Sequence, residues 1–81
     1  MSAITLARLR EPFPIAIPGL HISTAAPGLW RVARADGAVL GHIERPGDSE
    51  RYHARRLLPG GIRSVPIGAF WSPRDAADVF R

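Results

Sequence analysis

The stretch that decides the fold is IGAFWSPRDAADVFR, residues 67–81. Its first residues, as far as Phe70, indicate a strand, and the residues that follow carry the signals of a helix start. Ser72 is a good N-cap, and Pro73 suits the first helical position, where no N–H is needed. Asp75 stands where a capping-box carboxylate can reach back to the cap. The sequence therefore predicts a strand that runs directly into a helix beginning at Ser72.

The predicted helix is too short to be stable by itself. It has about nine residues, whereas isolated helices in water need roughly 12–15. Its apolar side chains must therefore pack on a sheet. We expect Ala76, Val79 and Phe80 to do so, against Trp30 and Tyr52.

A hairpin is predicted earlier in the chain. Residues 30–34 and 39–44 flank Asp36-Gly37, a dipeptide typical of two-residue hairpin turns. Such a turn would place three pairs opposite one another: Arg34 with Val39, Val32 with Gly41, and Trp30 with Ile43. One face of this hairpin would be apolar and would pack on the core. It holds Trp30, Val32, Val39 and Ile43.

Two further strands are expected after the hairpin. Residues 50–58 alternate, with Tyr52, Ala54 and Leu58 on one side. Residues 59–61, Pro-Gly-Gly, supply a turn, and residues 63–70 form the fourth strand. Pro66 cannot donate a ladder hydrogen bond, so this strand is expected at an edge of the sheet.

Residues 1–28 differ from the rest because prolines lie close together there, at positions 12, 14, 18 and 27. Residues 13–18 are therefore expected to be extended, while residues 3–10 leave room for one short helical turn. Two roles are open for this arm: it packs on the domain, or it offers apolar side chains to a partner or a second copy. Such a protein interface would comprise Phe13, Ile15 and Ile17, together with Trp71 at the strand–helix corner.

These elements predict an α+β domain, with a small antiparallel four-stranded meander sheet and one C-terminal helix packed on one face. We expect residues 1–28 to form an extended Pro-rich arm and residues 29–81 to form the sheet and helix as a single domain. A chain of 81 residues buries only about 60–65% of the surface that it exposes when unfolded. Its stability is therefore expected to be small.

The composition favours an acidic or polyanionic partner. All 11 positive side chains are arginine, and against seven acidic residues they give a formal net charge of +4. A GC-rich genome would explain the preference for arginine over lysine, but the excess positive charge remains whatever its origin. The absence of cysteine fits a reducing compartment, and prolines interrupt the apolar residues near the start. We therefore expect a cytoplasmic protein with no membrane segment.

The predicted register places basic side chains on the face of the sheet that the helix leaves open. Arginine forks on such a face can contact phosphates and base edges. Small antiparallel sheets also normally show one charged face to solvent, so a plain solvated face is the alternative interpretation. The residues concerned are Arg31, His42, Arg51, His53 and Arg55.

Catalytic and metal-binding patterns are poorly represented. The chain has no cysteine nucleophile, no phosphate-cradling glycine loop and no paired carboxylates in a plausible pocket. His21, His42 and His53 match no compact ligand spacing. A domain of this size also has little volume to enclose a substrate. We expect no enzyme activity, no metal, no cofactor and no small-molecule substrate.

Three segments resemble the DNA-binding domains of plant ethylene-response factors, and integrase amino-terminal arms look similar. The segments are residues 29–32, 52–56 and 67–77, in which Gly68, Phe70, Ala76 and Ala77 match the family pattern. The resemblance implies a three-stranded sheet in the major groove with a helix behind it. It also implies that the DNA-facing residues are Arg31, Arg34, Arg51, His53 and Arg55.

This chain departs from that family in an extra strand over residues 39–44, in Pro66 and in its shorter helix. It also looks like the short arginine-rich proteins of GC-rich actinobacteria and their phages, a likeness that implies no activity.

The leading hypothesis is a small non-catalytic nucleic-acid-binding or regulatory module. Its nucleic-acid-binding residues would be Arg31, Arg34, His42, Arg51, His53 and Arg55. The alternative is a protein-interaction module, a homo-oligomer or an adaptor, that uses the apolar arm and Trp71.

Overall fold

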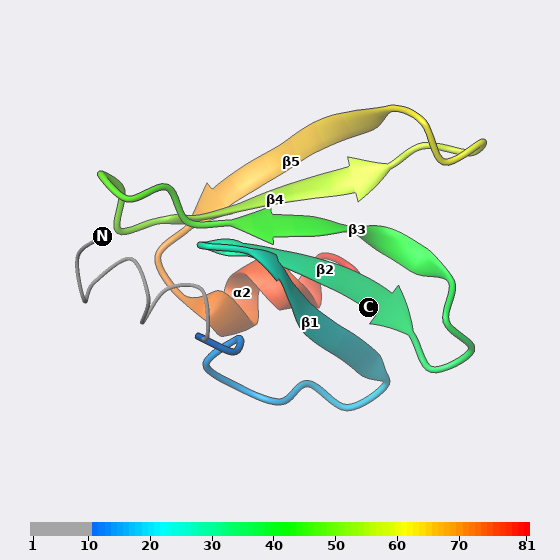
Figure 1. Cartoon of the computed structure of the whole chain (residues 1–81), viewed down its shortest axis with the longest axis horizontal. Helices are drawn as coiled ribbons and strands as arrows, with labels where there is room; N and C mark the ends of the chain where they lie inside the picture. Colours follow the sequence, from blue (N-terminus) through cyan, green and yellow to red (C-terminus); the bar gives the residue numbers. More distant parts are fainter. Residues whose placement is uncertain (1–10) are drawn as a thin grey trace.

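In the computed structural model, residues 11–81 are described, and they form one antiparallel sheet with a short helix on one face (Figure 1). The elements are β1 (Leu20–Ala26), β2 (Leu29–Arg34), β3 (Val39–Glu44), β4 (Tyr52–Leu57), β5 (Ser64–Phe70) and α2 (Pro73–Asp78). The predicted antiparallel sheet and final helix are confirmed. The expected number of strands was wrong, because residues 11–81 form five in the order β1-β2-β3-β4-β5. The helical turn expected over residues 3–10 lies outside the described residues.

The additional strand is β1, whose residues were expected to belong to the Pro-rich arm. It pairs with β2 and places Ile22 opposite Val32. Residues 27–28 make the tight connection to β2, and Gly28 supports it with a φ of 68°. A side chain at Gly28 would also run into the carbonyl oxygen of Arg45, 2.6 Å from an ideal Cβ. Proline and glycine therefore end a strand of the sheet here and do not mark the end of a separate extended arm.

The β2–β3 hairpin confirms most of the predicted register. Trp30 pairs with Ile43, and Val32 pairs with Gly41. The third predicted pair is wrong, because the register shifts after Val32 and Ala33, not Arg34, lies opposite Val39. The turn is also longer than two residues, because the Arg34 N–H donates to the Ala38 carbonyl at 2.9 Å and leaves residues 35–37 as the loop. Within it, the Ala38 N–H donates to the Asp36 carboxylate at 2.9 Å. This local side-chain bond stabilises a wider turn than Asp-Gly alone predicts.

Strands β4 and β5 form the second edge of the sheet. The edge position predicted from Pro66 is confirmed, since β5 pairs with β4 alone. Tyr52 and Ala54 are buried as expected. Leu58 is not: it lies beyond the end of β4 and is 37% exposed.

Helix α2 begins as the sequence predicts. The Ser72 hydroxyl accepts the Asp75 N–H at 3.2 Å, and Pro73 occupies the first turn. The regular helix is shorter than the nine residues expected, because a tighter bond from the Phe80 N–H to the Ala77 carbonyl closes it. Among residues 11–81, no helix is long and apolar enough to cross a bilayer.

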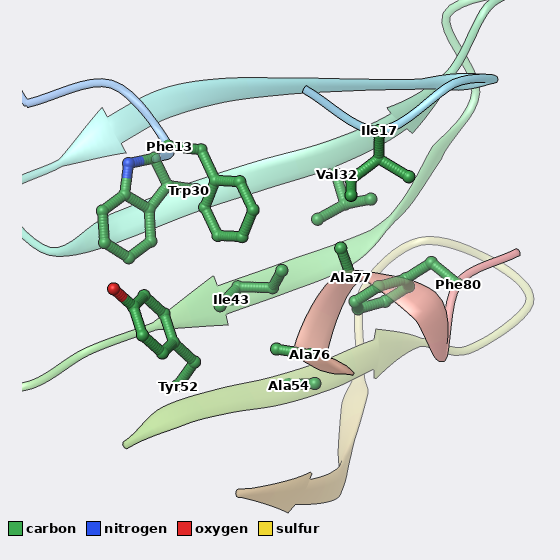
Figure 2. Packing of buried hydrophobic residues seen from close by; sticks show 10 residues of the cluster. All are labelled: Phe13, Ile17, Trp30, Val32, Ile43, Tyr52, Ala54, Ala76, Ala77 and Phe80. Atoms are coloured by element: carbon green, nitrogen blue, oxygen red, sulfur yellow. The ribbon is translucent and has the colours of Figure 1, made fainter. Parts of the chain in front are cut away.

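The hydrophobic core lies between the sheet and α2 (Figure 2). At one end Phe13, Trp30 and Tyr52 pack together, with Phe13 edge-on to Trp30 at a centroid distance of 5.4 Å. Phe80 was expected against Trp30 and Tyr52, but it belongs to the other end of the core and contacts the Gly41 position. The absence of a side chain at Gly41 makes the space that Phe80 fills.

The described part of the N-terminal segment is packed on the domain. Phe13 and Ile17 are 7% and 4% exposed. The Glu11 carbonyl accepts hydrogen bonds from the Thr24 hydroxyl at 2.9 Å and from the Trp30 indole at 3.3 Å. Phe13 and Ile17 are therefore core residues with little surface for a partner, which corrects the interface expected there. Ile15 is half-buried and Trp71 is exposed.

The N-cap gives a direct test of the strand–helix unit. We expect Ser72→Ala to lower the free energy of unfolding by about 1 kcal/mol, because one helix N–H loses its acceptor. Urea denaturation followed by tryptophan fluorescence measures the change. Ser23→Ala, on the exposed part of β1, is the matched control and should leave the urea midpoint in place. Equal midpoints for Ser72→Ala and wild type would contradict a stabilising role for the cap.

Candidate functional site

A row of basic side chains crosses the middle of the face opposite the helix. Arg31 in β2 pairs with His42 in β3, and His42 pairs with Arg55 in β4. Paired residues project to the same side, and their neighbours Trp30 and Ile43 point to the core, so the row faces away from α2. Adjacent strands lie about 4.8 Å apart, which brings all three residues within about 10 Å. We call Arg31, His42 and Arg55 the basic row.

The two arginines of the basic row are held differently. Arg55 donates from Nε to the Ser64 hydroxyl at 3.0 Å and from Nη2 to the Ser64 carbonyl at 3.1 Å. Its guanidinium is fixed against β5 yet remains exposed. The Arg31 side chain is exposed and has no hydrogen-bond or ion-pair partner within residues 11–81. The basic row therefore contains one guanidinium held in a fixed orientation, that of Arg55, and one without a partner among residues 11–81, that of Arg31.

A second row lies beside the first, nearer the loop between β3 and β4. Glu44 pairs with His53, and His53 pairs with Ala69 at the edge. His53 Nε2 lies 3.4 Å from the Ser49 hydroxyl, which ties its ring to the loop. Glu44 is the acidic side chain in these two rows, so positive groups outnumber it.

Arg51 and Trp71 extend the surface at its far end. The Arg51 guanidinium carbon lies 4.3 Å from the centre of the Trp71 ring, a close cation–π contact. Trp71 is nevertheless 67% exposed. Both residues line a shallow depression that also includes His53, Asp48 and Glu50. The contact between Arg51 and Trp71 therefore places an exposed aromatic ring beside the basic side chains, and two carboxylates lie on the loop side of the depression.

Five of the six residues predicted to contact nucleic acid therefore gather on this side of the sheet: Arg31, His42, Arg51, His53 and Arg55. Arg34 does not join them. It follows Trp30 and Val32 at every second position and lies with Phe80 and Arg81 around a hollow on the helix side. Its Nε is 3.8 Å from the Asp36 carboxylate, an exposed ion pair that contributes little stability.

Two contributors to this surface were not predicted from the sequence. Trp71 was assigned to a protein interface, yet it stacks with Arg51; its alternation with the inward-facing Phe70 was the available signal. Ser64 positions Arg55, and no sequence pattern marks that role. Among residues 11–81, no three histidine, cysteine or acidic side chains come close enough to hold a metal ion.

Comparison with known proteins shows a partial similarity to a much longer protein. A stretch of human lactase/phlorizin hydrolase is 33% identical over 75 residues, which cover 86% of this chain. The chain spans about 4% of the length of that curated relative. No family model matches the chain, and no solved structure matches it. The resemblance to ethylene-response factors stays a prediction.

Proposed function

We propose that this protein is a small, non-catalytic nucleic-acid-binding module that uses the open face of its sheet. The observation that carries the proposal is the basic row, in which Arg31, His42 and Arg55 align across three strands, with both arginines exposed and His42 half-buried. A cytoplasmic location, expected from the lack of cysteine, belongs to the same proposal.

The hydrogen bonds that hold Arg55 favour a phosphate-binding role for this face over a face that only contacts solvent. A long exposed side chain that is free loses rotamer entropy when a ligand fixes it, by about 1–2 kcal/mol. The two bonds to Ser64 have already fixed Arg55, so a phosphate that contacts it meets a preorganised donor. Arg31 lies two strands away and can contact a second phosphate.

We expect the double variant Arg31→Gln and Arg55→Gln to weaken binding of a labelled mixed-sequence oligonucleotide. Each lost phosphate contact should reduce the slope of log K against log salt by roughly 0.7–0.9, so the double variant should lose up to about 1.8 units. Fluorescence anisotropy titrations at a series of salt concentrations measure both the affinity and the slope.

The matched control is Arg63→Gln with Arg74→Gln, which removes the same charge from exposed positions before β5 and in α2. It should change the slope much less, because these residues lie outside the basic row. Equal effects of the two double variants would mean that net charge alone drives binding, which would contradict a site on the open face.

Protein interaction remains the second candidate function, because large apolar side chains are exposed along the β4–β5 hairpin. Ile62 is 92% exposed, Ile67 is 43% exposed, and Trp71 lies nearby in the chain at 67%. Exposed apolar groups of this size in a short segment favour a protein interface. Light scattering with and without Ile62→Ser and Ile67→Ser tests this: self-association that both substitutions abolish would support it.

A further inference from the structure

We propose that the open face binds single-stranded nucleic acid in preference to duplex, with one base stacked on Trp71 and the phosphates directed to the basic row. This inference rests on the proposed function, which it narrows to one class of ligand. Three features of the structure support it: the width of the sheet, the exposed Trp71 with its bound Arg51, and the position of the acidic residues.

The sheet is too wide to enter a groove as a unit. Five strands with four spacings of about 4.8 Å span about 19 Å, whereas the major groove of B-DNA is about 12 Å wide. The three-stranded sheet implied by the ethylene-response-factor resemblance would span about 10 Å and would fit. In this sheet, β1 and β5 lie on either side of β2–β4. The backbones of a duplex would therefore contact these outer strands before the base edges reached the basic row.

Trp71 offers an exposed aromatic face on which an unstacked base can stack. Arg51 covers part of the ring from 4.3 Å, yet two-thirds of the residue is exposed, so ring surface away from Arg51 is open. Bases of single strands stack on such aromatic and arginine planes, whereas bases inside a duplex are already stacked on one another. Trp71 lies at the strand–helix corner held by the Ser72 cap, which gives the platform a fixed position.

Asp48 and Glu50 indicate in which direction a bound nucleic-acid strand leaves Trp71. Asp48 and Glu50 lie in the loop on one side of the Trp71 depression, and they repel phosphate. From Arg51, which immediately precedes β4, the path leads through His53 to Arg55, and Glu44 lies beside His53 on the β3 side of this path. At about 3.3 Å per residue this path is about 13 Å long. Sheet surfaces that stack two or three bases are known for single-stranded RNA recognition, and this length suits a similarly short segment.

The test compares the full chain on a labelled mixed-sequence 12-mer and on the duplex of the same sequence, at one low salt concentration. We expect the single strand to bind at least about tenfold more tightly. Trp71→Ala should weaken single-strand binding by about 5- to 150-fold, the effect of losing one stacked base. Trp71→Phe should retain part of the affinity, since it keeps an aromatic face. Duplex binding should change little in either variant.

The matched control is Ile62→Ala, which truncates another exposed apolar side chain, in the turn before β5 and at the opposite end of that strand from Trp71, and should leave both affinities unchanged. Circular dichroism and urea midpoints establish that each variant folds. Duplex binding equal to or tighter than single-strand binding, or no effect of Trp71→Ala, would overturn this inference; if the basic-row variants still weaken binding, the proposed function stands. Failure of both ligands to bind at low salt would overturn both.

Discussion

Gly41→Ala is expected to destabilise the fold by at least about 3 kcal/mol, although it adds a single methyl group. An ideal Cβ at Gly41 would collide with the carbonyl oxygen of Arg55 and would lie 2.7 Å from Cε1 of Phe80. The ring of Phe80 could move, but the Arg55 carbonyl belongs to the neighbouring strand. It cannot retreat without disturbing the pairing of β3 with β4.

The total stability of an 81-residue domain is about 4–12 kcal/mol, so a loss of this size leaves a large unfolded fraction. Urea denaturation monitored by the fluorescence of buried Trp30 measures it. The double variant Gly41→Ala with Phe80→Leu should not recover stability, because the collision with the backbone remains.

Gly68→Ala is the matched control for this prediction. Gly68 also lies in a strand, but a Cβ there would meet only the tip of the Phe70 ring, at 3.1 Å. The end of a side chain can shift by the few tenths of an ångström needed, so we expect a change below about 1 kcal/mol. If Gly41→Ala unfolded at the wild-type urea concentration, the close approach of β3 and β4 would be refuted.

The sequence predicted those parts of the fold that local chemistry determines. The Ser72 cap, the pairing of Trp30 with Ile43 and the edge position of Pro66 each follow from one residue's hydrogen bonding or from a short alternating pattern. The same alternation correctly placed Arg31 and Arg55 on the face away from the core.

The parts that were missed depend on contacts between distant segments. Strand β1 is an edge strand with only Leu20, Ile22 and Ala26 partly buried, so its alternation is weak and nearby prolines suggested an arm. The register shift falls between the pairs Val32–Gly41 and Ala33–Val39. Gly41 was the available signal for it, since an isolated glycine inside a strand suggests a bulge. The assignment of Arg34 to a DNA-facing surface came from the family resemblance, whereas alternation from Trp30 already placed this residue on the helix side.

Phe13→Ala tests the largest of these differences, the role of the N-terminal segment. We expect it to lower the free energy of unfolding by about 3–5 kcal/mol, as removal of a buried aromatic ring does. The ring contacts Trp30 edge-on at 5.4 Å and Tyr52 at 6.1 Å, so its loss opens a cavity between two other aromatic residues. Urea denaturation with fluorescence detection again measures the change.

The two roles considered for this segment give opposite results in that experiment. Ile15→Ala, two residues away and half-buried, is the control and should cost about 1 kcal/mol, because much of its side chain already meets solvent. A segment that served only to bind a partner would give small losses for both variants and a change in association. A large loss for Phe13→Ala in the monomer means that residues 11–19 complete the core, since Phe13 then stabilises the same sheet that positions Arg31 and Trp71.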